Sequence, residues 1–397
     1  MFEKTPLIQA IDKGDMTTAI ELYQQGEKIP HSQHSYDYNQ LYDTLLRNKG
    51  YELINLMSEN GEIEKDIYML DKIDGSIYSS IIKKRNPDGD FVAFLQDFIS
   101  SSDNINDEVS GETLLSYAIQ SKVDSSIIKA MVDAGCRVDF KDNSENNLIN
   151  ISIKKHDLKG DELISYVEIL SNEGIDINEP NKIGQTALHI AMESNKSNIL
   201  DLLLQNGADP NQQDHEGNSA FFIAVAHKGN IDLYKKLAEY DSMDFEQTNK
   251  RGEKALHHIL KNTSGFSHSV DLILQMIEDG VDLKSTCMHY DNAYSGWYWI
   301  AQQNAESFQK IFNSAGPDIN EQDDLGNTLL HLVVVKDSNH DQNVAKETYK
   351  KVKFLLDNGA SASMLNNQEK TAMMLASEDN LKGKTVELLL IAEQKER

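Results

Sequence analysis

The feature that most constrains this chain is a short pattern that returns at intervals of about 33 to 43 residues. Its clearest copy reads NKIGQTALHIA from Asn181, continues through the apolar run 199–204, and ends GADPN at 207–211. Periods of this length indicate stacked units, because one such unit cannot bury its apolar face alone. The 397 residues also suit two or three globular domains, but the recurrence favours one array of about ten to twelve units.

Each position of this copy has a mechanical role. Gly184 suits a turn with positive φ, and the Thr186 hydroxyl can cap the first N–H groups of a short helix. Ala191 is small enough for a neighbouring helix to approach, and Gly207 can end the second helix in the left-handed conformation. His189 can bond to a neighbouring loop backbone, so we interpret it as a structural hydrogen-bonding residue and not as a catalyst.

The hexad TALHIA at 186–191 and the ending GADPN at 207–211 resemble the ankyrin repeat, whose first helix opens with Thr-Pro-Leu-His-x-Ala. The one departure in the hexad is Ala187, where the family most often has proline. The resemblance implies an all-α fold. We expect an ankyrin-repeat solenoid of about ten to eleven helix-turn-helix units with short β-hairpin fingers and no separate globular domain.

Weaker copies of the pattern divide the chain into five stretches. They are 1–61 (an N-terminal capping unit and a second unit), 62–110 (a degenerate repeat), 111–285 (central repeats), 286–322 (an aromatic-rich divergent repeat) and 323–397 (C-terminal repeats and a cap). The C-terminal cap is expected to be a helix with a polar outer face.

The repeat at 286–322 contains both tryptophans of the chain. Aligned through the Ile-Ala pair at 300–301, it places Trp297, Tyr298 and Trp299 at the family's proline, leucine and histidine positions. In this alignment Tyr298 and Trp299 face the neighbouring repeat and belong to the core. Trp297 is expected at the exposed concave rim, where aromatic side chains are enriched among the strongest partner contacts.

Ankyrin proteins contact partners through their finger tips and the exposed side of the first helix, so the resemblance implies a concave protein-binding face. A residue at one of these positions, taken singly, is more often merely solvent-exposed than in contact with a partner. The expected contact residues are Lys182, Ile183, His215, Glu216, Lys250, Arg251, Asp324 and Leu325 from the finger tips, with Tyr290, Tyr294 and Trp297 from the aromatic repeat.

Charge and composition narrow the class of partner. The chain carries 38 basic and 64 acidic side chains, a net charge of −26, which disfavours nucleic acid and anionic lipid. A basic protein partner is compatible with this charge, although an acidic solvated surface alone also accounts for it. The sequence predicts no membrane-spanning segment. Cys136 and Cys287 are expected to be free thiols in a reducing, cytoplasmic compartment, and the chain is expected to be monomeric.

The sequence also holds a few weak signals for catalytic or metal chemistry. Cys287 with His289, and the pair His257–His258, invite a metal or nucleophile, but no Cys-x-x-Cys or His-Glu-x-x-His accompanies them. We therefore predict no enzyme activity, no cofactor and no metal. The alternative hypothesis is an enzyme, or an enzyme-targeting subunit, with unrecognised chemistry in 62–110. A plain helix pair in that stretch would favour the scaffold.

The chain is rich in lysine, isoleucine and asparagine and resembles divergent ankyrin-repeat proteins of intracellular bacteria. That analogy implies an effector delivered into host cytoplasm. The stretch from Glu393 to Arg397 is compatible with an export signal.

Overall fold

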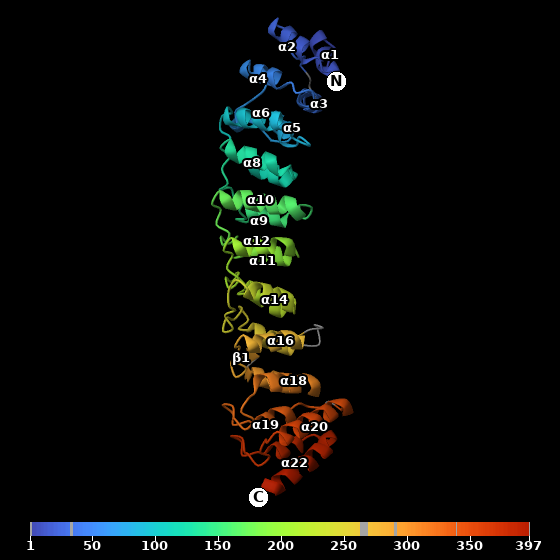
Figure 1. Cartoon of the computed structure of the whole chain (residues 1–397), viewed down its shortest axis with the longest axis vertical. Coiled ribbons are helices and arrows are strands. Elements are labelled where there is room, and N and C mark those ends of the chain that lie inside the picture. The colour runs from blue at the N-terminus through green and yellow to red at the C-terminus, as the bar shows by residue number, and fades with distance from the viewer. Residues whose placement is uncertain (1, 32–34, 263–268, 290–291, 339, 397) are drawn as a thin grey trace. The chain divides into compact units, whose positions relative to one another are not determined.

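The computed structural model describes residues 2–31, 35–262, 269–289, 292–338 and 340–396. The chain divides into two compact units, Met1–Asp209 and Pro210–Arg397. Helix pairs follow one another in chain order in each unit (Figure 1). The described residues form six pairs in the first unit and five in the second. This confirms the all-α repeat fold and the expected number of units.

The first unit consists of short helices joined by tight turns. Its pairs are α1 (Pro6–Lys13) with α2 (Met16–Gln24), α3 (Ser35–Arg47) with α4 (Tyr51–Glu59), α5 (Ile77–Ile82) with α6 (Gly89–Ser100), α7 (Leu114–Ser121) with α8 (Ser125–Asp133), α9 (Leu148–Lys154) with α10 (Gly160–Asn172), and α11 (Ala187–Glu193) with α12 (Leu200–Gln205). Two 3₁₀ turns, η1 (Ile67–Met69) and η2 (Ser197–Ile199), precede α5 and α12.

The second unit repeats this plan with one irregular helix and one β-hairpin. Its elements are α13 (Ala220–Phe222), which continues as the π turn η3 (Ile223–His227), α14 (Ile231–Ala238), α15 (Ala255–Lys261), α16 (Ser269–Glu278), β1 (Thr286–His289), β2 (Asn292–Ser295), α17 (Gly296–Ala301), α18 (Ala305–Ala315), α19 (Leu329–Val334), α20 (Gln342–Asp357), α21 (Ala372–Ala376), the 3₁₀ turn η5 (Asn380–Lys382) and α22 (Gly383–Glu396).

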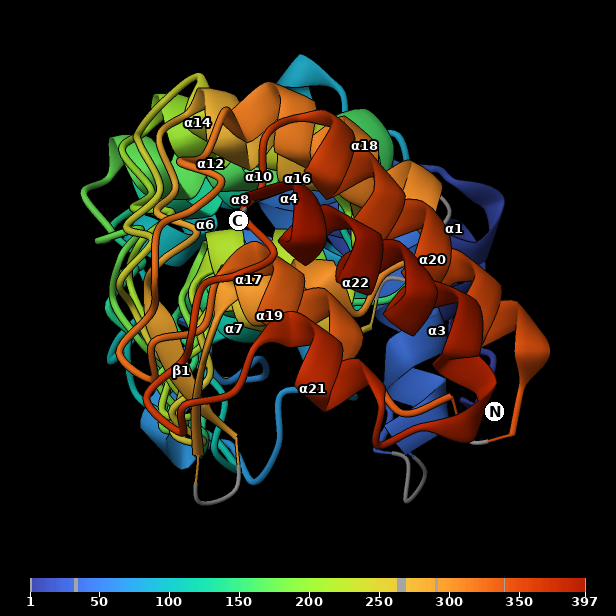
Figure 2. The same ribbon diagram turned by 90° about the horizontal axis from the view of Figure 1, so that it is seen from below.

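First helices pack on first helices and second helices on second helices. In the second unit α15, α17, α19 and α21 form one layer, and α14, α16, α18, α20 and α22 form the other. Figure 2 shows α17, α19 and α21 in the lower half of the view, where β1 also lies, and α14, α16 and α18 in the upper half. The core lies between the two layers, where Leu256, Ile300 and Val333 are buried.

The threonine and histidine of the pattern cap the N-terminus of the first helix. The Thr186 hydroxyl lies 2.8 Å from Nδ1 of His189, and the Thr328 hydroxyl lies 2.9 Å from Nδ1 of His331. The other ring nitrogen of His331, Nε2, bonds the carbonyl of Lys370 in the next finger at 3.1 Å. The structural role predicted for the repeat histidine is therefore what these two copies adopt.

The asparagine that ends each Asp-x-Asn stretch links successive repeats. Asn178 donates through Nδ2 to the carbonyl of Gly207 at 2.8 Å and accepts from the amide of Asp209 at 2.9 Å. Asn320 makes the matching pair with the carbonyl of Gly359 at 3.1 Å and the amide of Ser361 at 2.8 Å. These bonds satisfy backbone groups beyond a helix C-terminus, where intrahelical partners are missing.

Buried lysines bind the C-terminal carbonyls of a helix in the preceding repeat. The ammonium of Lys196 donates to the carbonyl of Lys155, the C-cap of α9, at 2.7 Å, and that of Lys382 donates to the carbonyl of Val334, at the end of α19, at 2.8 Å. Lys351 is also fully buried, and burial lowers its pKa to about 7. The repeat pattern gave no sign of these contacts.

The degenerate stretch 62–110 forms a plain helix pair. Helix α5 packs on α3, and α6 packs on α8, so the pair continues both layers of the first unit. Ile77 and Phe98 are buried within it. This arrangement meets the criterion that favours a scaffold over a separate catalytic region.

The last helix, α22, includes Glu393 to Glu396 of the stretch expected to resemble an export signal. Glu396 accepts from the amides of Ala362 at 2.8 Å and Ser363 at 3.1 Å, and Glu393 is buried. The outer face of α22 is not wholly polar, since Leu390 is 43% and Ile391 45% exposed. None of the helices in the described ranges is both long and apolar enough to span a membrane.

Candidate protein-binding face

The finger tips are built from a recurring Asp or Asn turn. In the second unit Oδ1 of Asp323 accepts from the amides of Leu325 at 2.9 Å and Asn327 at 2.8 Å, and Asn249 does the same for Arg251 and Glu253. Such Asx turns hold the two residues after the Asp or Asn at the tip of the loop.

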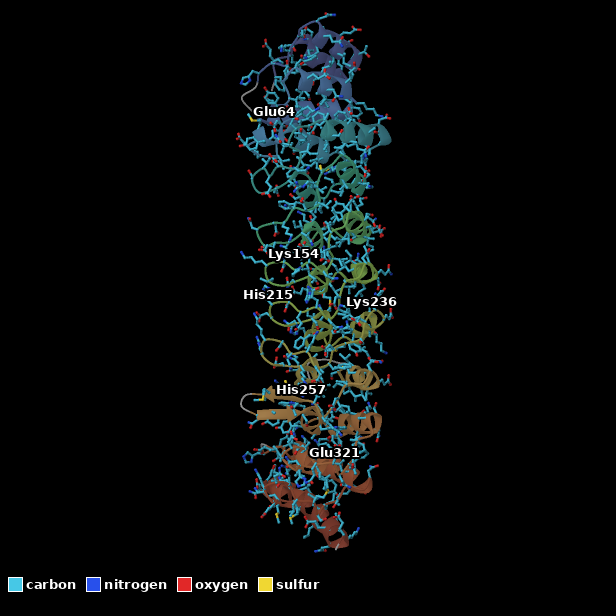
Figure 3. All side chains as sticks on the ribbon, turned by 90° about the vertical axis from the view of Figure 1, so that its left-hand side faces the viewer. Glu64, Lys154, His215, Lys236, His257 and Glu321 are labelled. Atoms are coloured by element: carbon cyan, nitrogen blue, oxygen red, sulfur yellow. The ribbon has the colours of Figure 1, made fainter. Side chains whose placement is uncertain are left out.

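The predicted finger-tip residues of the second unit are all exposed. They are His215, Glu216, Lys250, Arg251, Asp324 and Leu325. The amide of Lys250 donates to the carbonyl of Glu216 at 2.8 Å, so adjacent fingers are bonded to each other. In Figure 3 His215 lies on the finger side of the ribbon, while Lys236 of α14 lies on the opposite side.

The two finger-tip residues predicted in the first unit are exposed as well. Ile183 is 56% exposed, and the amide of Lys182 donates to the carbonyl of Ser144 in the preceding finger at 2.9 Å. Lys182 and Ile183 therefore lie at an exposed finger tip of the first unit.

The expected alignment of the aromatic repeat is wrong by one residue. Ser295 caps α17 by accepting from the amide of Tyr298 at 3.3 Å, so Trp297 takes the leucine position and Tyr298 the histidine position. Trp297 is only 7% exposed and packs edge-on against Phe312, with ring centroids 6.5 Å apart. Trp297 is therefore a core residue and not a residue of the concave rim.

A close backbone contact sets this alignment. The amide of Trp297 donates to the carbonyl of Leu283 at 3.2 Å, as the amide of Phe221, which follows Ser219 at the start of α13, does to the carbonyl of Pro210 at 3.3 Å. A Cβ on Gly296 would lie 2.8 Å from the carbonyl oxygen of Leu283. The close approach leaves no room for a side chain at position 296, and in this register Trp297 takes the leucine position, one place later than expected.

The expectation for the other two aromatic residues of α17 is corrected as well. Tyr298 and Trp299 are half-buried and contact the hairpin instead of the core. Tyr298 stacks on Tyr294 of β2 with centroids 4.1 Å apart, and Trp299 meets Tyr294 edge-on at 5.6 Å. His289 of β1 lies edge-on to Trp299 at 5.2 Å. We call His289, Tyr294, Tyr298 and Trp299 the aromatic patch.

Strand pairing positions the patch. In the antiparallel register Cys287 faces Tyr294 and His289 faces Asn292. Residues two apart on a strand share a face, so Cys287 and His289 point the same way as Tyr294. This hairpin is the one two-stranded sheet in the described residues, and it carries Tyr294 to the helix surface. Tyr290, which was predicted to join this surface, lies outside the described residues.

A polar group from the preceding repeat borders the aromatic patch. The ammonium of Lys261 lies 3.1 Å from Nδ1 of His289, 3.2 Å from a carboxylate oxygen of Glu253, and 5.7 Å from the ring centroid of Trp299. Partial burial lowers the pKa of His289, and the Lys261 ammonium adds to that shift. The imidazole is therefore neutral at physiological pH and accepts from Lys261.

The residues that invited a catalytic interpretation have structural partners. Nε2 of His257 bonds the carbonyl of Ser285 at 3.1 Å, and Sγ of Cys287 lies 3.0 Å from the carbonyl of Gly252. Burial raises the pKa of the Cys136 thiol to about 12. Within the described ranges no three His, Cys, Asp or Glu side chains form a group that could hold a metal ion.

His257 differs from the other repeat histidines. Lys254 stands where threonine caps the helix in other copies, and in the described part of the chain Nδ1 of His257 has no hydrogen-bond partner. Burial lowers the pKa of His257 to about 4. The His257 imidazole is therefore neutral, and it serves to link two repeats through its bond to Ser285.

Comparison with known proteins identifies the family of this chain. A model described as ankyrin repeats, in three copies, matches residues 115–214 and 297–396, which together make up half of the chain. An ankyrin repeat protein of Acanthamoeba polyphaga mimivirus is 26% identical over 193 residues, 48% of this chain and 23% of that protein. Human ankyrin repeat and SOCS box protein 6 is 28% identical over 137 residues, 34% of this chain and 32% of that protein.

A solved structure, the ankyrin repeat domain of Bcl-3, is similar to 63% of this chain and 100% of its own, with a TM-score of 0.48 and 20% identity. The chain spans about a quarter to a third of the length of the first curated relatives it matches. The Thr/His caps and the helix pairs preceded by a turn fit the pattern of this repeat. This chain belongs to the ankyrin-repeat family.

Proposed function

We propose that the chain is a non-catalytic module that binds a protein partner through the finger tips and first helices of its second unit. The observation that carries this proposal is the aromatic patch, His289, Tyr294, Tyr298 and Trp299, which the hairpin holds beside α17. Ankyrin repeats generally serve as protein-protein interaction modules, and this family membership supports the choice of a protein as ligand.

The chemistry of the patch favours a contact of high affinity. Aromatic side chains offer a large area at low entropy cost, and a few such residues carry most of the energy of an interface. The four rings already lie against one another at centroid distances of 4.1 to 6.4 Å, so little ordering is needed on binding. The finger tips add charges of both signs: Asp324 and Arg251 are exposed, and Glu216 pairs with Lys250 at 3.5 Å.

A photo-crosslinking experiment tests the location of the contact. A photoreactive phenylalanine analogue replaces Tyr294, and in a matched control it replaces Tyr240, which is 40% exposed just after α14 in the second-helix layer. We expect a discrete covalent adduct from position 294 in cell lysate and none from position 240. Identical adducts from both positions, or adducts from position 240 alone, would contradict the proposal.

The captured protein then allows a measurement of affinity. Tyr294→Ala and Trp299→Ala should each weaken binding at least about tenfold, because truncation of an interface hot spot costs about 2 kcal/mol or more. Tyr240→Ala should change affinity less than about twofold. Unchanged affinity in both patch variants, with the thermal midpoint retained, would place the contact elsewhere.

The alternative of an enzyme with chemistry in 62–110 has weaker support. That stretch folds as one helix pair of the array, and the ankyrin fold is typically a non-catalytic scaffold. Cytoplasmic location, a monomeric state and delivery into a host cell stay predictions. Binding of the partner by the purified chain alone, without any cofactor, would be the first support for the module as proposed.

A further inference from the structure

A hollow in the first unit is lined by four basic side chains. It has a volume of about 530 Å³ and lies between α3 and the end of α5, the first helices of two successive pairs. Arg47, Lys83, Lys84 and Arg85 line it, together with Asp43 and Asp74. It includes two of the five arginines in a chain whose net charge is −26. This size is in the range of sites that hold small ligands or single side chains.

Two of the lining charges neutralise each other. The ammonium of Lys83 lies 2.9 Å from Oδ1 of Asp74, which also accepts from the Tyr117 hydroxyl at 3.0 Å. The hydrogen bond from Lys83 is the main cause that lowers the pKa of Asp74, so this carboxylate stays ionised and paired. The Lys83–Asp74 pair therefore adds no net charge to the hollow.

The remaining cations lack carboxylate partners. Arg47 and Arg85 are exposed, and neither guanidinium makes a hydrogen bond or ion pair in the described part of the chain. Asp43 lies four residues before Arg47 on α3, a spacing that suits an ion pair, yet no bond joins the two side chains. The Lys84 ammonium donates to a neutral group, the carbonyl of Leu46, at 3.2 Å.

We propose that this hollow, which we call the Arg47–Arg85 pocket, binds a phosphomonoester group. Guanidinium groups present paired N–H donors that match the oxygens of phosphate, and three unneutralised cations against one free carboxylate suit a dianion better than a single carboxylate. The negative charge of the whole chain does not prevent this, since remote carboxylates are screened beyond about 8 Å at physiological ionic strength. The overall charge instead suppresses unspecific binding of anions.

A phosphomonoester can come from a phosphorylated side chain of a protein or from a small free metabolite. Arg47 and Arg85, which line the pocket, are exposed, so a ligand from either source can reach them. The proposal goes beyond the protein-binding role of the second unit, because it concerns other residues and another ligand chemistry. If the aromatic patch variants bound their partner with unchanged affinity, the phosphomonoester proposal would still stand.

Calorimetric titration of the full chain tests the proposal with three probes of defined chemistry. They are a peptide with one phosphoserine, the same peptide with glutamate at that position, and phosphoserine capped at both ends. We expect the phosphopeptide to bind at least about tenfold more tightly than the glutamate peptide. Equal affinity of the two peptides, or no binding of either phosphorylated probe, would overturn the proposal. A phosphopeptide that binds more tightly than capped phosphoserine identifies a protein source, and equal affinities identify a small molecule.

Paired variants separate the pocket from general electrostatics. Arg47→Gln with Arg85→Gln should reduce phosphopeptide affinity at least about tenfold. Arg137→Gln is the matched control, since Arg137 is an exposed arginine of the same unit whose guanidinium lies 2.6 Å from Asp139; it should change affinity less than about twofold. Equal losses in the double variant and the control would show charge attraction without a site. Because Arg47 and Arg85 are exposed and unpaired, both proteins are expected to keep the wild-type thermal midpoint.

Discussion

The two tryptophans allow a sharp test of the alignment in the aromatic repeat, because they are the only two in the chain and differ in environment. Trp297 is buried against Phe312, whereas Trp299 is half-buried in the aromatic patch. Trp297→Ala should lower the free energy of unfolding by about 3–5 kcal/mol, the usual cost of removing a large buried aromatic ring. Trp299→Ala should cost roughly 1–2 kcal/mol, since about half as much ring area is lost.

Urea unfolding followed by far-UV circular dichroism measures both free energies. Fluorescence adds a readout of position, because each single variant keeps one tryptophan. In Trp299→Ala the remaining Trp297 should emit at short wavelength and resist acrylamide quenching. In Trp297→Phe, which keeps an aromatic ring in the core, the remaining Trp299 should emit at longer wavelength and be quenched readily.

The reverse result would refute the reasoning. If Trp299→Ala were the more destabilising change and Trp297 the more readily quenched residue, the original alignment with Trp297 at the rim would be correct. Equal quenching of both tryptophans would mean that the close contact between Gly296 and Leu283 does not set the register.

Two further predictions concern stability. The pKa of His257 is lowered to about 4 in the folded chain, so the unfolded chain binds a proton first as the pH falls below about 6.5. The free energy of unfolding should therefore drop by roughly 2 kcal/mol between pH 7 and pH 5 through this residue. Urea unfolding at the two pH values should show a smaller drop for His257→Gln than for the wild type. Equal drops in the two proteins would contradict this prediction. Leu188 is fully buried in α11, and Leu188→Ala should cost about 2–4 kcal/mol. Hydrogen exchange should then rise first in α9 to α12 and not in α1, whereas a uniform rise would contradict local coupling between repeats.

Much of this protein could be predicted from its sequence because the relevant interactions span a few residues. The cap between Thr186 and His189 and the turn begun by Asp323 are formed within three or four positions. Since every repeat reuses these local bonds, their recurrence predicted the all-α fold, the number of units and the exposure of finger-tip residues such as Ile183 and Leu325.

The features that the sequence did not predict depend on contacts between repeats, which no local pattern encodes. The one-residue shift that buries Trp297 follows from the approach of Gly296 to Leu283, more than ten positions earlier. The aromatic patch gains Lys261 from the preceding repeat, and the Arg47–Arg85 pocket joins side chains almost forty positions apart. A sequence shows which side chains exist, but packing decides which of them are buried and which charges stay unpaired, because both depend on neighbours that only the folded chain brings together.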